Sequence, residues 1–432
     1  MQRLELILWI GSMSVSNMSL PRLRDNILAL SVVQAGNYLV PLLALPFLAR
    51  VLGIHAYGEV VFVQTVMMFG MLLVDFGFSW SATRDISASR DDRGKVSTLF
   101  AGIWGLQWLL LAVVVLLVLL SVWWLPSLRP NASLYLTGLG IVLGQVLFPL
   151  WLFQGLEALK VAAVIQVVGK VLAIPCLLIW VDGPQDQVAA IAFFSASSVL
   201  SGLGAVWWIH RSKWVEWFWP SRADLAQAFR QGAWIFGSRV SISLYTTAIP
   251  LAVGLWAGPA QLAAFNLADK VRVLIQGFLA PVAQALFPRM SYLINRDRVA
   301  AFSLLTKSAW IVGVVSLLSG GLVWWFADEI MLILGGNDFI HTGDILRWLA
   351  FVPLMVAGSN TLGVQVMLPR GMNRAFMTIL TAASIMSLVG LYPAVMNAEA
   401  RGAAQLVLLV ECVVTLAMAL YLRREAHNWR VK

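Results

Sequence analysis

The chain is 432 residues long, and 60% of the residues are hydrophobic while only 12% are charged. Soluble domains carry roughly 25% charged residues, so a soluble globular protein is excluded. Apolar runs of about 18 residues or more recur along the whole chain, which is the pattern of membrane-spanning helices. They are too long and too uniform for the strands of a membrane barrel. The sequence therefore predicts an all-α polytopic membrane protein.

The chain begins with a predicted cytoplasmic arm, residues 1–26. Residues 6–13 are apolar but too few for a cleavable signal or a span, and Met18 offers a second possible start of translation. About twelve spans follow, in two six-helix lobes around a central cavity. We predict them near 27–48, 58–80, 97–124, 133–153, 161–181, 188–209, 233–256, 261–286, 303–326, 345–367, 376–396 and 402–422. The corresponding domains are an N-lobe (27–213), a linker (214–232), a C-lobe (233–424) and a cytoplasmic tail (425–432).

Lys and Arg residues indicate how these spans are oriented. The predicted outer loops hold only three of the thirty, Arg50, Arg129 and Arg401, whereas most lie in the arm, the even-numbered loops and the tail. Cytoplasmic loops are enriched in these residues, so both ends of the chain are expected in the cytoplasm. The formal net charge of +9 then reflects topology, and no nucleic-acid partner is expected.

A tryptophan-rich segment separates the two predicted lobes. Residues 207–219 (WWIHRSKWVEWFW) place five tryptophans among cations. Because Trp prefers the headgroup level and Lys and Arg prefer the anionic inner leaflet, this segment should lie along the cytoplasmic interface. A faint repeat relates the lobes: residues 51–57 (VLGIHAY) and 256–262 (WAGPAQL) both stand between the first and second spans of a set. Duplicated halves are usual in secondary transporters.

The eighth span carries the most informative polar face. At 100° per residue, its polar side chains crowd onto one half of the helix. A charge in mid-membrane costs about 2.5–3.5 kcal/mol, so several on one span need an explanation. Asp269 and Arg272 are three residues apart and can pair, which leaves Lys270 as a cation that faces substrate. The alternative is an ion cluster that only orients helices. The polar set comprises Asn266, Asp269, Lys270, Arg272, Gln276, Gly277, Pro281 and Gln284.

Other spans carry similar polar stripes, for which hydrogen bonding between helices is the alternative interpretation. The predicted spans contain five cations but only three anions. The predicted cavity is therefore net positive and suits phosphate. The predicted substrate-binding residues are Lys270, Arg50, Arg272, Arg239, Lys170, Asn266, Asn37, Gln34 and Arg347. The anions are Asp75, Asp269 and Glu411, of which Asp75 and Asp269 are candidates for ion coupling.

Several chemistries are not expected. Cys176 and Cys412 lie in apolar runs and the four histidines are scattered, so no metal site is predicted. No phosphate-binding loop motif is present, and no cofactor is expected. The predicted outer loops are short and show no nucleophile–base pair, which argues against an enzyme. Transport would be driven by an ion gradient, the membrane potential or a substrate gradient.

Several ordered motifs resemble those of polysaccharide transporters of the O-antigen flippase type. Residues 45–58 (LPFLARVLGIHAYG) resemble their first loop, and residues 151–157 (WLFQGLE) resemble their W-[LF]-F-Q-G-x-E box. Residues 264–270 (AFNLADK) and 284–291 (QALFPRMS) are similar to elements around their eighth span, and residues 365–371 (QVMLPRG) to a late box. The resemblance covers about residues 22–425.

The resemblance implies a twelve-helix transporter of the superfamily that includes multidrug exporters and the peptidoglycan-precursor flippase. Its implied substrate is an oligosaccharide on undecaprenyl pyrophosphate, moved from the inner to the outer leaflet of the bacterial cytoplasmic membrane. The precursor flippase has arginine at the position of Lys270, and phosphate binding tolerates that exchange. A polysaccharide polymerase and a chain-length regulator are implied partners, beside membrane lipids. The alternatives are a multidrug exporter, which would want a more acidic cavity, and a non-catalytic partner of a glycan assembly complex.

The distribution of Lys and Arg makes a testable prediction about topology. Reporter fusions after Arg93 and Trp219 should report the cytoplasm, and fusions near Asp182 and Asn337 should report the outside. The measurement is the activity of a compartment-specific reporter in whole cells. A cytoplasmic signal at Asn337 would show that the spans of the second half are miscounted.

Overall fold

The computed structural model describes residues 20–293 and 296–430, with side chains described outside 20–43, 237–246, 278–285, 287–289, 426–430 and a few single positions. Helices make up nearly all of these residues, and no strand occurs among them. The predicted all-α class is confirmed. Helix is expected here because a spanning segment must satisfy every backbone N–H and C=O within itself.

Among the described residues of the N-terminal lobe there are seven α-helices. α2 (Leu20–Asp75) is kinked at Gly53, whose φ of 74° interrupts the helix and separates the first two predicted spans. A short 3-10 helix, η1 (Pro126–Asn131), links α4 to α5. The remaining helices are α3 (Phe78–Ala88), α4 (Arg93–Trp124), α5 (Ala132–Leu147), α6 (Leu150–Gly155), α7 (Leu159–Trp180) and α8 (Gln187–Ser212).

The second half begins with two 35-residue helices, α9 (Arg222–Trp256) and α10 (Pro259–Leu293). The last helix, α15 (Asn373–Arg430), is interrupted at Ala398 and Glu399, where the last two predicted spans meet. Between them lie α11 (Arg298–Trp325), α12 (Ala327–Gly335), η2 (Asn337–Thr342), α13 (Gly343–Leu349), α14 (Val352–Ser359) and the π-helix η3 (Asn360–Met367).

Helix covers each of the twelve predicted spans. Among the described residues, eight segments are long and apolar enough to cross a membrane. α4 and α11 expose large apolar side chains along their length, such as Leu117 (53% exposed) and Leu318 (62%). Surfaces of this kind face lipid, so the chain is a multi-pass membrane protein. The count of twelve spans stays a prediction.

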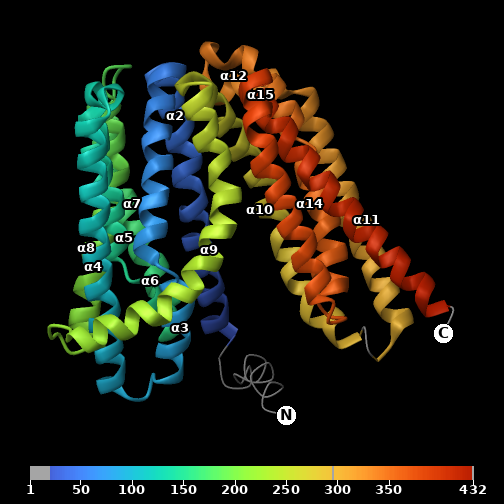
Figure 1. Ribbon diagram of the computed structural model, residues 1–432, viewed down its shortest axis with the longest axis horizontal. Coiled ribbons are helices and arrows are strands. Elements are labelled where there is room, and N and C mark those ends of the chain that lie inside the picture. The colour runs from blue at the N-terminus through green and yellow to red at the C-terminus, as the bar shows by residue number, and fades with distance from the viewer. Residues whose placement is uncertain (1–19, 294–295, 431–432) are drawn as a thin grey trace.

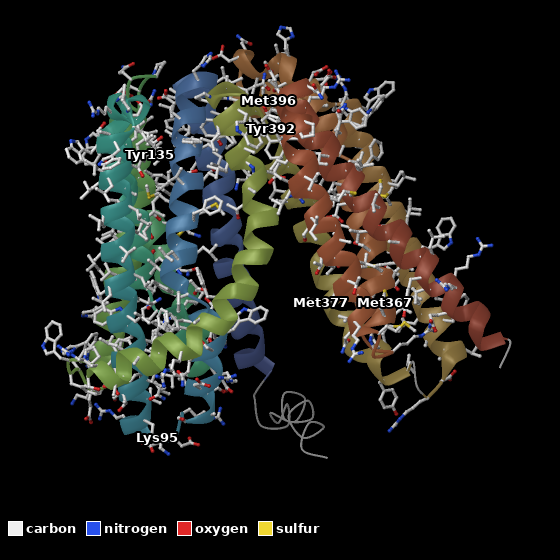
Figure 2. The ribbon with its side chains drawn as sticks, in the orientation of Figure 1. Lys95, Tyr135, Met367, Met377, Tyr392 and Met396 are labelled. Carbon is white, nitrogen blue, oxygen red and sulfur yellow. The ribbon has the colours of Figure 1, made fainter. Side chains whose placement is uncertain are left out.

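The helices form two lobes that approach each other at the upper end of Figure 1 and diverge toward the lower end. The start of α2 and the end of α15 both lie at the lower end. In Figure 2, Lys95, from a loop predicted to be cytoplasmic, also marks the lower end, while Tyr392 and Met396 mark the upper end. We call the upper end the outer end, following the predicted orientation.

One helix belongs to both lobes. α9 starts under the N-lobe, where Asp224 lies so close to α4 that a Cβ on Gly102 would be 3.0 Å from its carbonyl oxygen. It runs diagonally to the outer end, where the Trp256 ring meets that of Tyr392 on α15 at 5.1 Å (Figure 1). The predicted linker 214–232 is therefore only in part a linker, since residues from Arg222 onward are the first turns of α9.

Small residues let the helices of the N-lobe pack closely. A Cβ on Gly144 of α5 would lie 2.1 Å from the Ser198 hydroxyl of α8, and one on Gly202 would lie 2.4 Å from the Leu147 side chain. In lipid, van der Waals contact between close backbones replaces the hydrophobic effect as the force that holds helices together. Glycine is thus required where α5 and α8 cross.

The WLFQGLE box closes the inner end of the N-lobe. The Trp151 indole donates to Gln107, whose amide in turn donates to the carbonyl of Val74. The Thr83 hydroxyl donates to Gln154 at 3.1 Å, tying α3 to α6. These bonds satisfy polar groups of a buried layer, so the box has a structural role here.

Candidate functional site between the lobes

The polar residues of α10 face two different parts of the molecule. Arg272 pairs with Asp269 at 2.6 Å and donates to the side-chain oxygen Oε1 of Gln276 at 2.9 Å. Asp269 and Arg272 line a pocket of about 140 Å³ inside the C-lobe, together with Glu411 of α15. The predicted pair of Asp269 and Arg272 is therefore present, and it faces the interior of the C-lobe.

Lys270 projects from a different side of α10. It is exposed and forms no ion pair with any residue that the structure describes. It follows Asn266 by four residues, so the two share one helix face. Asn266 contacts the N-lobe, which assigns Lys270 to the same side, one turn toward the inner end of the molecule.

The two lobes meet at the outer end in a contact that we call the outer seam. The buried Tyr57 hydroxyl donates to the Asn266 side-chain oxygen at 3.2 Å, which joins α2 to α10. One residue along, a Cβ on Gly58 would lie 1.9 Å from the carbonyl oxygen of Pro259, so the two backbones touch. The Tyr57 ring also meets Phe339 of η2 edge-on at 6.3 Å.

Arg50 contributes a second polar contact to the outer seam. Its guanidinium donates to the carbonyl oxygen of Ile333 in α12, across the lobes. The side chain stays exposed, and it lies beside Gly336, since a Cβ there would be 3.5 Å from Arg50 Cγ, an ordinary van der Waals distance. Arg50 therefore stands at the outer edge of the seam, with Lys270 on its inner side.

The repeat noted in the sequence coincides with the seam. Both copies contain a glycine with positive φ, Gly53 at 74° and Gly258 at 91°, and a helix follows each. L-residues with side chains rarely adopt this conformation, so glycine suits the sharp entry into both helices. The two helices that begin there, the second part of α2 and α10, are the ones that form the seam.

The other predicted residues are not joined to these two cations by any contact among the described residues. Arg347 pairs with Asp328 at 2.6 Å and with Asp344 at 2.8 Å near the outer end, so two carboxylates already engage it. Lys170 is half-buried on α7. The side chains of Gln34, Asn37 and Arg239 lie outside the described residues. None of these five is brought next to Lys270 by a described contact.

The ion-coupling candidates sit in separate places. Asp75 ends α2 and is buried, and it accepts a hydrogen bond from the Ser79 hydroxyl. Asp269 is paired with Arg272. Sequence reasoning named Glu411 only as an anion within a span, and it missed Tyr57 as a contact between lobes. The sequence feature that could have indicated this contact is the segment 45–58, which resembles the first loop of the transporter family. Tyr57 lies in that segment, immediately before the glycine that contacts Pro259.

A second cavity of the C-lobe, of about 240 Å³, lies against the π-helix η3. Its polar lining includes Gln276, Asn360, Thr361 and Gln365. The Gln276 amide nitrogen is buried without a hydrogen-bond partner among the described residues. π-helices are rare and frequent at functional sites, so this cavity is a secondary candidate for polar groups of a substrate.

A two-lobed helical bundle of this kind is the transporter fold of known membrane exporters. The structure is similar to "Lipid II flippase MurJ, inward closed conformation" with a TM-score of 0.74 and 12% identity, over 92% of this chain and 87% of that one. It is also similar to an inward-facing multidrug resistance MATE family transporter of the MOP superfamily. The TM-score is 0.69 and the identity 14%, over 94% of this chain and 99% of that one. At these identities the likeness concerns the fold.

Sequence comparison gives the family. The family described as "Polysaccharide biosynthesis protein" matches residues 23–294. The chain is 30% identical to "Putative O-antigen transporter" of Escherichia coli (strain K12), over 93% of this chain and 97% of that protein. It is 26% identical to "Putative O-antigen transporter" of Shigella dysenteriae, over 92% of this chain and 99% of that protein. The chain belongs to the polysaccharide biosynthesis protein family, as the resemblance of its motifs predicted.

The seam makes a prediction for Tyr57→Phe. The ring is kept and only the hydrogen bond to Asn266 is lost, which is worth about 1 kcal/mol net. We expect the fraction of molecules with separated outer ends to rise about fivefold. The measurement is the distance distribution between spin labels at Asp182→Cys and Asn337→Cys, with Cys176 and Cys412 replaced by Ala.

The matched control is Tyr135→Phe, which removes a hydroxyl buried within the N-lobe alone. This variant should leave the distances unchanged. An unchanged distribution in Tyr57→Phe would show that the hydrogen bond does not hold the seam.

Proposed function

We propose that this protein is a flippase that moves an undecaprenyl-pyrophosphate-linked oligosaccharide from the inner to the outer leaflet of the bacterial cytoplasmic membrane. The oligosaccharide is a repeat unit of O-antigen or another surface polysaccharide. Family membership and the O-antigen transporter relatives support the substrate class. The Lys and Arg distribution supports cytoplasmic ends, as does the position of both described ends on one side of the molecule (Figure 1).

The observation that carries the proposal is the cation on the lobe-facing side of α10. Lys270 lies one helical turn inward of the outer seam, is exposed, and has no carboxylate partner among the described residues. An uncompensated charge at this depth is expensive unless something else neutralises it. A phosphate of the substrate would supply that compensation while the sugars occupy the space between the lobes.

The mechanism is alternating access. With the outer seam closed and the inner ends apart, the pyrophosphate enters beside Lys270 while the polyprenyl tail stays in lipid. Rocking of the lobes would break the contacts of Tyr57 and Arg50 and open the outer end. Buried apolar side chains such as Leu52 and Phe339 accompany the polar contacts at the seam. All of these contacts are non-covalent, so they can break and re-form. No covalent bond changes, and Asp75 and Asp269 remain candidates for coupling to an ion gradient.

A multidrug exporter is the second candidate, favoured by the fold shared with the MATE transporter. Such an exporter binds organic cations and would want carboxylates on the lobe-facing side. Here the carboxylates of α10 and α15, Asp269 and Glu411, line a pocket inside the C-lobe with Arg272. The arrangement of charge therefore favours an anionic substrate.

Substitution of Lys270 tests the proposed cation. Lys270→Ala should abolish glycan export, whereas Lys270→Arg should keep much of it, because positive charge beside the phosphate is the required property. The measurement is surface-glycan abundance in a deletion strain complemented with each variant at matched membrane levels. Normal export by well-expressed Lys270→Ala would remove Lys270 from the substrate site.

Arg50→Lys separates two roles of Arg50. A lysine retains a donor for the Ile333 carbonyl, so a residue that only closed the seam would tolerate the change. A guanidinium that grips phosphate in two-pronged fashion would not. We expect Arg50→Lys to lose most export in the same complementation assay. Full complementation would limit Arg50 to the seam and leave Lys270 as the main cation.

A further inference from the structure

A large apolar recess lies on the N-lobe, and none of its lining residues belongs to the seam. It has a volume of about 740 Å³ and lies between α4 and the segment that leads from α8 into α9. We call it the aromatic groove and define it by Trp104, Trp108, Leu109, Trp217, Trp219 and Pro220. Four of its six defining residues are tryptophans, and no charged side chain lines it.

The groove is a built structure and not a loose loop. The Trp217 ring stands edge-on against Phe100 at 5.4 Å and against Trp104 at 5.3 Å. The Trp104 indole is held in turn by its bond to the Val146 carbonyl at 2.9 Å. The segment crosses α4 at Gly105, where a Cβ would lie 2.6 Å from the Pro220 ring. Ring packing and close approach therefore fix the walls.

The groove opens toward lipid. Leu109 (53% exposed) is part of it, and α4 continues from there with exposed apolar side chains such as Leu116 (54%) and Leu117 (53%). Trp219 is 95% exposed at the rim. Tryptophan at the end of a span marks the headgroup level, so the groove lies where an acyl chain can leave the bilayer and enter protein.

Three cations flank the groove-forming segment in the sequence. Arg211 and Lys213 stand at the end of α8, and Arg222 opens α9, two residues after Pro220. Two carboxylates lie nearby, and both are engaged. Asp224 forms the capping box of α9 with Ser221, and Glu216 lies 3.9 Å from Arg93. The remaining positive charge suits an anionic headgroup.

We propose that the aromatic groove binds one anionic phospholipid of the inner leaflet. One acyl chain lies on the tryptophan wall, and the headgroup phosphate contacts Arg211, Lys213 and Arg222. The lipid then holds the first turn of α9 against α4, since Pro220 and Leu225 belong to the lining. α9 continues into the C-lobe, so the lipid anchors the helix that both lobes share. This site is separate from Lys270 and does not depend on the proposed substrate.

The test compares two matched tryptophan substitutions in the full-length protein. Leu109→Trp fills the groove, and Leu117→Trp places the same side chain on the lipid face of α4 two turns away. Native mass spectrometry in detergent, with added phosphatidylglycerol, measures the bound lipid. We expect Leu109→Trp to bind it at least about tenfold more weakly than Leu117→Trp, the loss that follows when about two CH₂ groups leave an apolar site.

The headgroup is tested by replacing Arg211, Lys213 and Arg222 with Gln. The wild-type protein should prefer phosphatidylglycerol over phosphatidylcholine, and each charge removed should weaken that preference about fivefold. Equal lipid binding by the Leu109→Trp and Leu117→Trp proteins would overturn the acyl site. An unaltered preference in the Gln variants would overturn the headgroup contact. Loss of a dimer mass in Leu109→Trp would instead assign the groove to a second copy of the chain.

Discussion

The direct contact of two backbones at the outer seam is the constraint on which the rest of the structure depends. Gly58 of α2 and Pro259 of α10 touch, and only a residue without Cβ permits this distance. The approach brings Tyr57 within reach of Asn266 and Arg50 within reach of Ile333. Since the lobes converge there and diverge elsewhere, the seam decides which side of the molecule is closed (Figure 1). The contacts that close it also define the side of α10 that faces the other lobe.

The cost of charge in a membrane explains how the polar residues are sorted. Arg272 pairs locally with Asp269 and donates a further hydrogen bond to Gln276. Arg347 does so with Asp328 and Asp344. These arginines are neutralised within one lobe and can stay so throughout a transport cycle. Lys270 has no such partner among the described residues, which is why we propose it as the cation that a substrate phosphate neutralises.

Local properties of the sequence predicted the fold well. Apolar length and helical period predicted the long helices, and the three-residue spacing of Asp269 and Arg272 predicted their pair, because these features need no knowledge of distant residues. The short helices α3 and α12 lie mostly or wholly outside the predicted spans. The sequence could not predict which neighbour each helix face contacts. Whether Asn266 or Arg272 faces the other lobe depends on how α10 is rotated against α2 and α15, which tertiary packing decides. The start of α9 at Arg222 was missed for the same reason. Helical turns at the membrane interface and turns within the membrane have the same helical period and differ only in what surrounds them.

The net charge of the predicted cavity likewise depends on which helix faces the charged residues occupy, and not on the total number of charges within the spans. Counting charges within spans gave five cations against three anions, a small excess. Two of those anions, Asp269 and Glu411, line the interior pocket of the C-lobe with one cation, Arg272, and two carboxylates hold another, Arg347. Removing these from the count leaves three cations, Lys170, Arg239 and Lys270, against one anion, Asp75. Of these cations Lys270 is assigned to the lobe-facing side of α10, and no described carboxylate is paired with it. The proposed role of Lys270 therefore rests on the face of α10 that it occupies, and not on the small excess of cations within the spans.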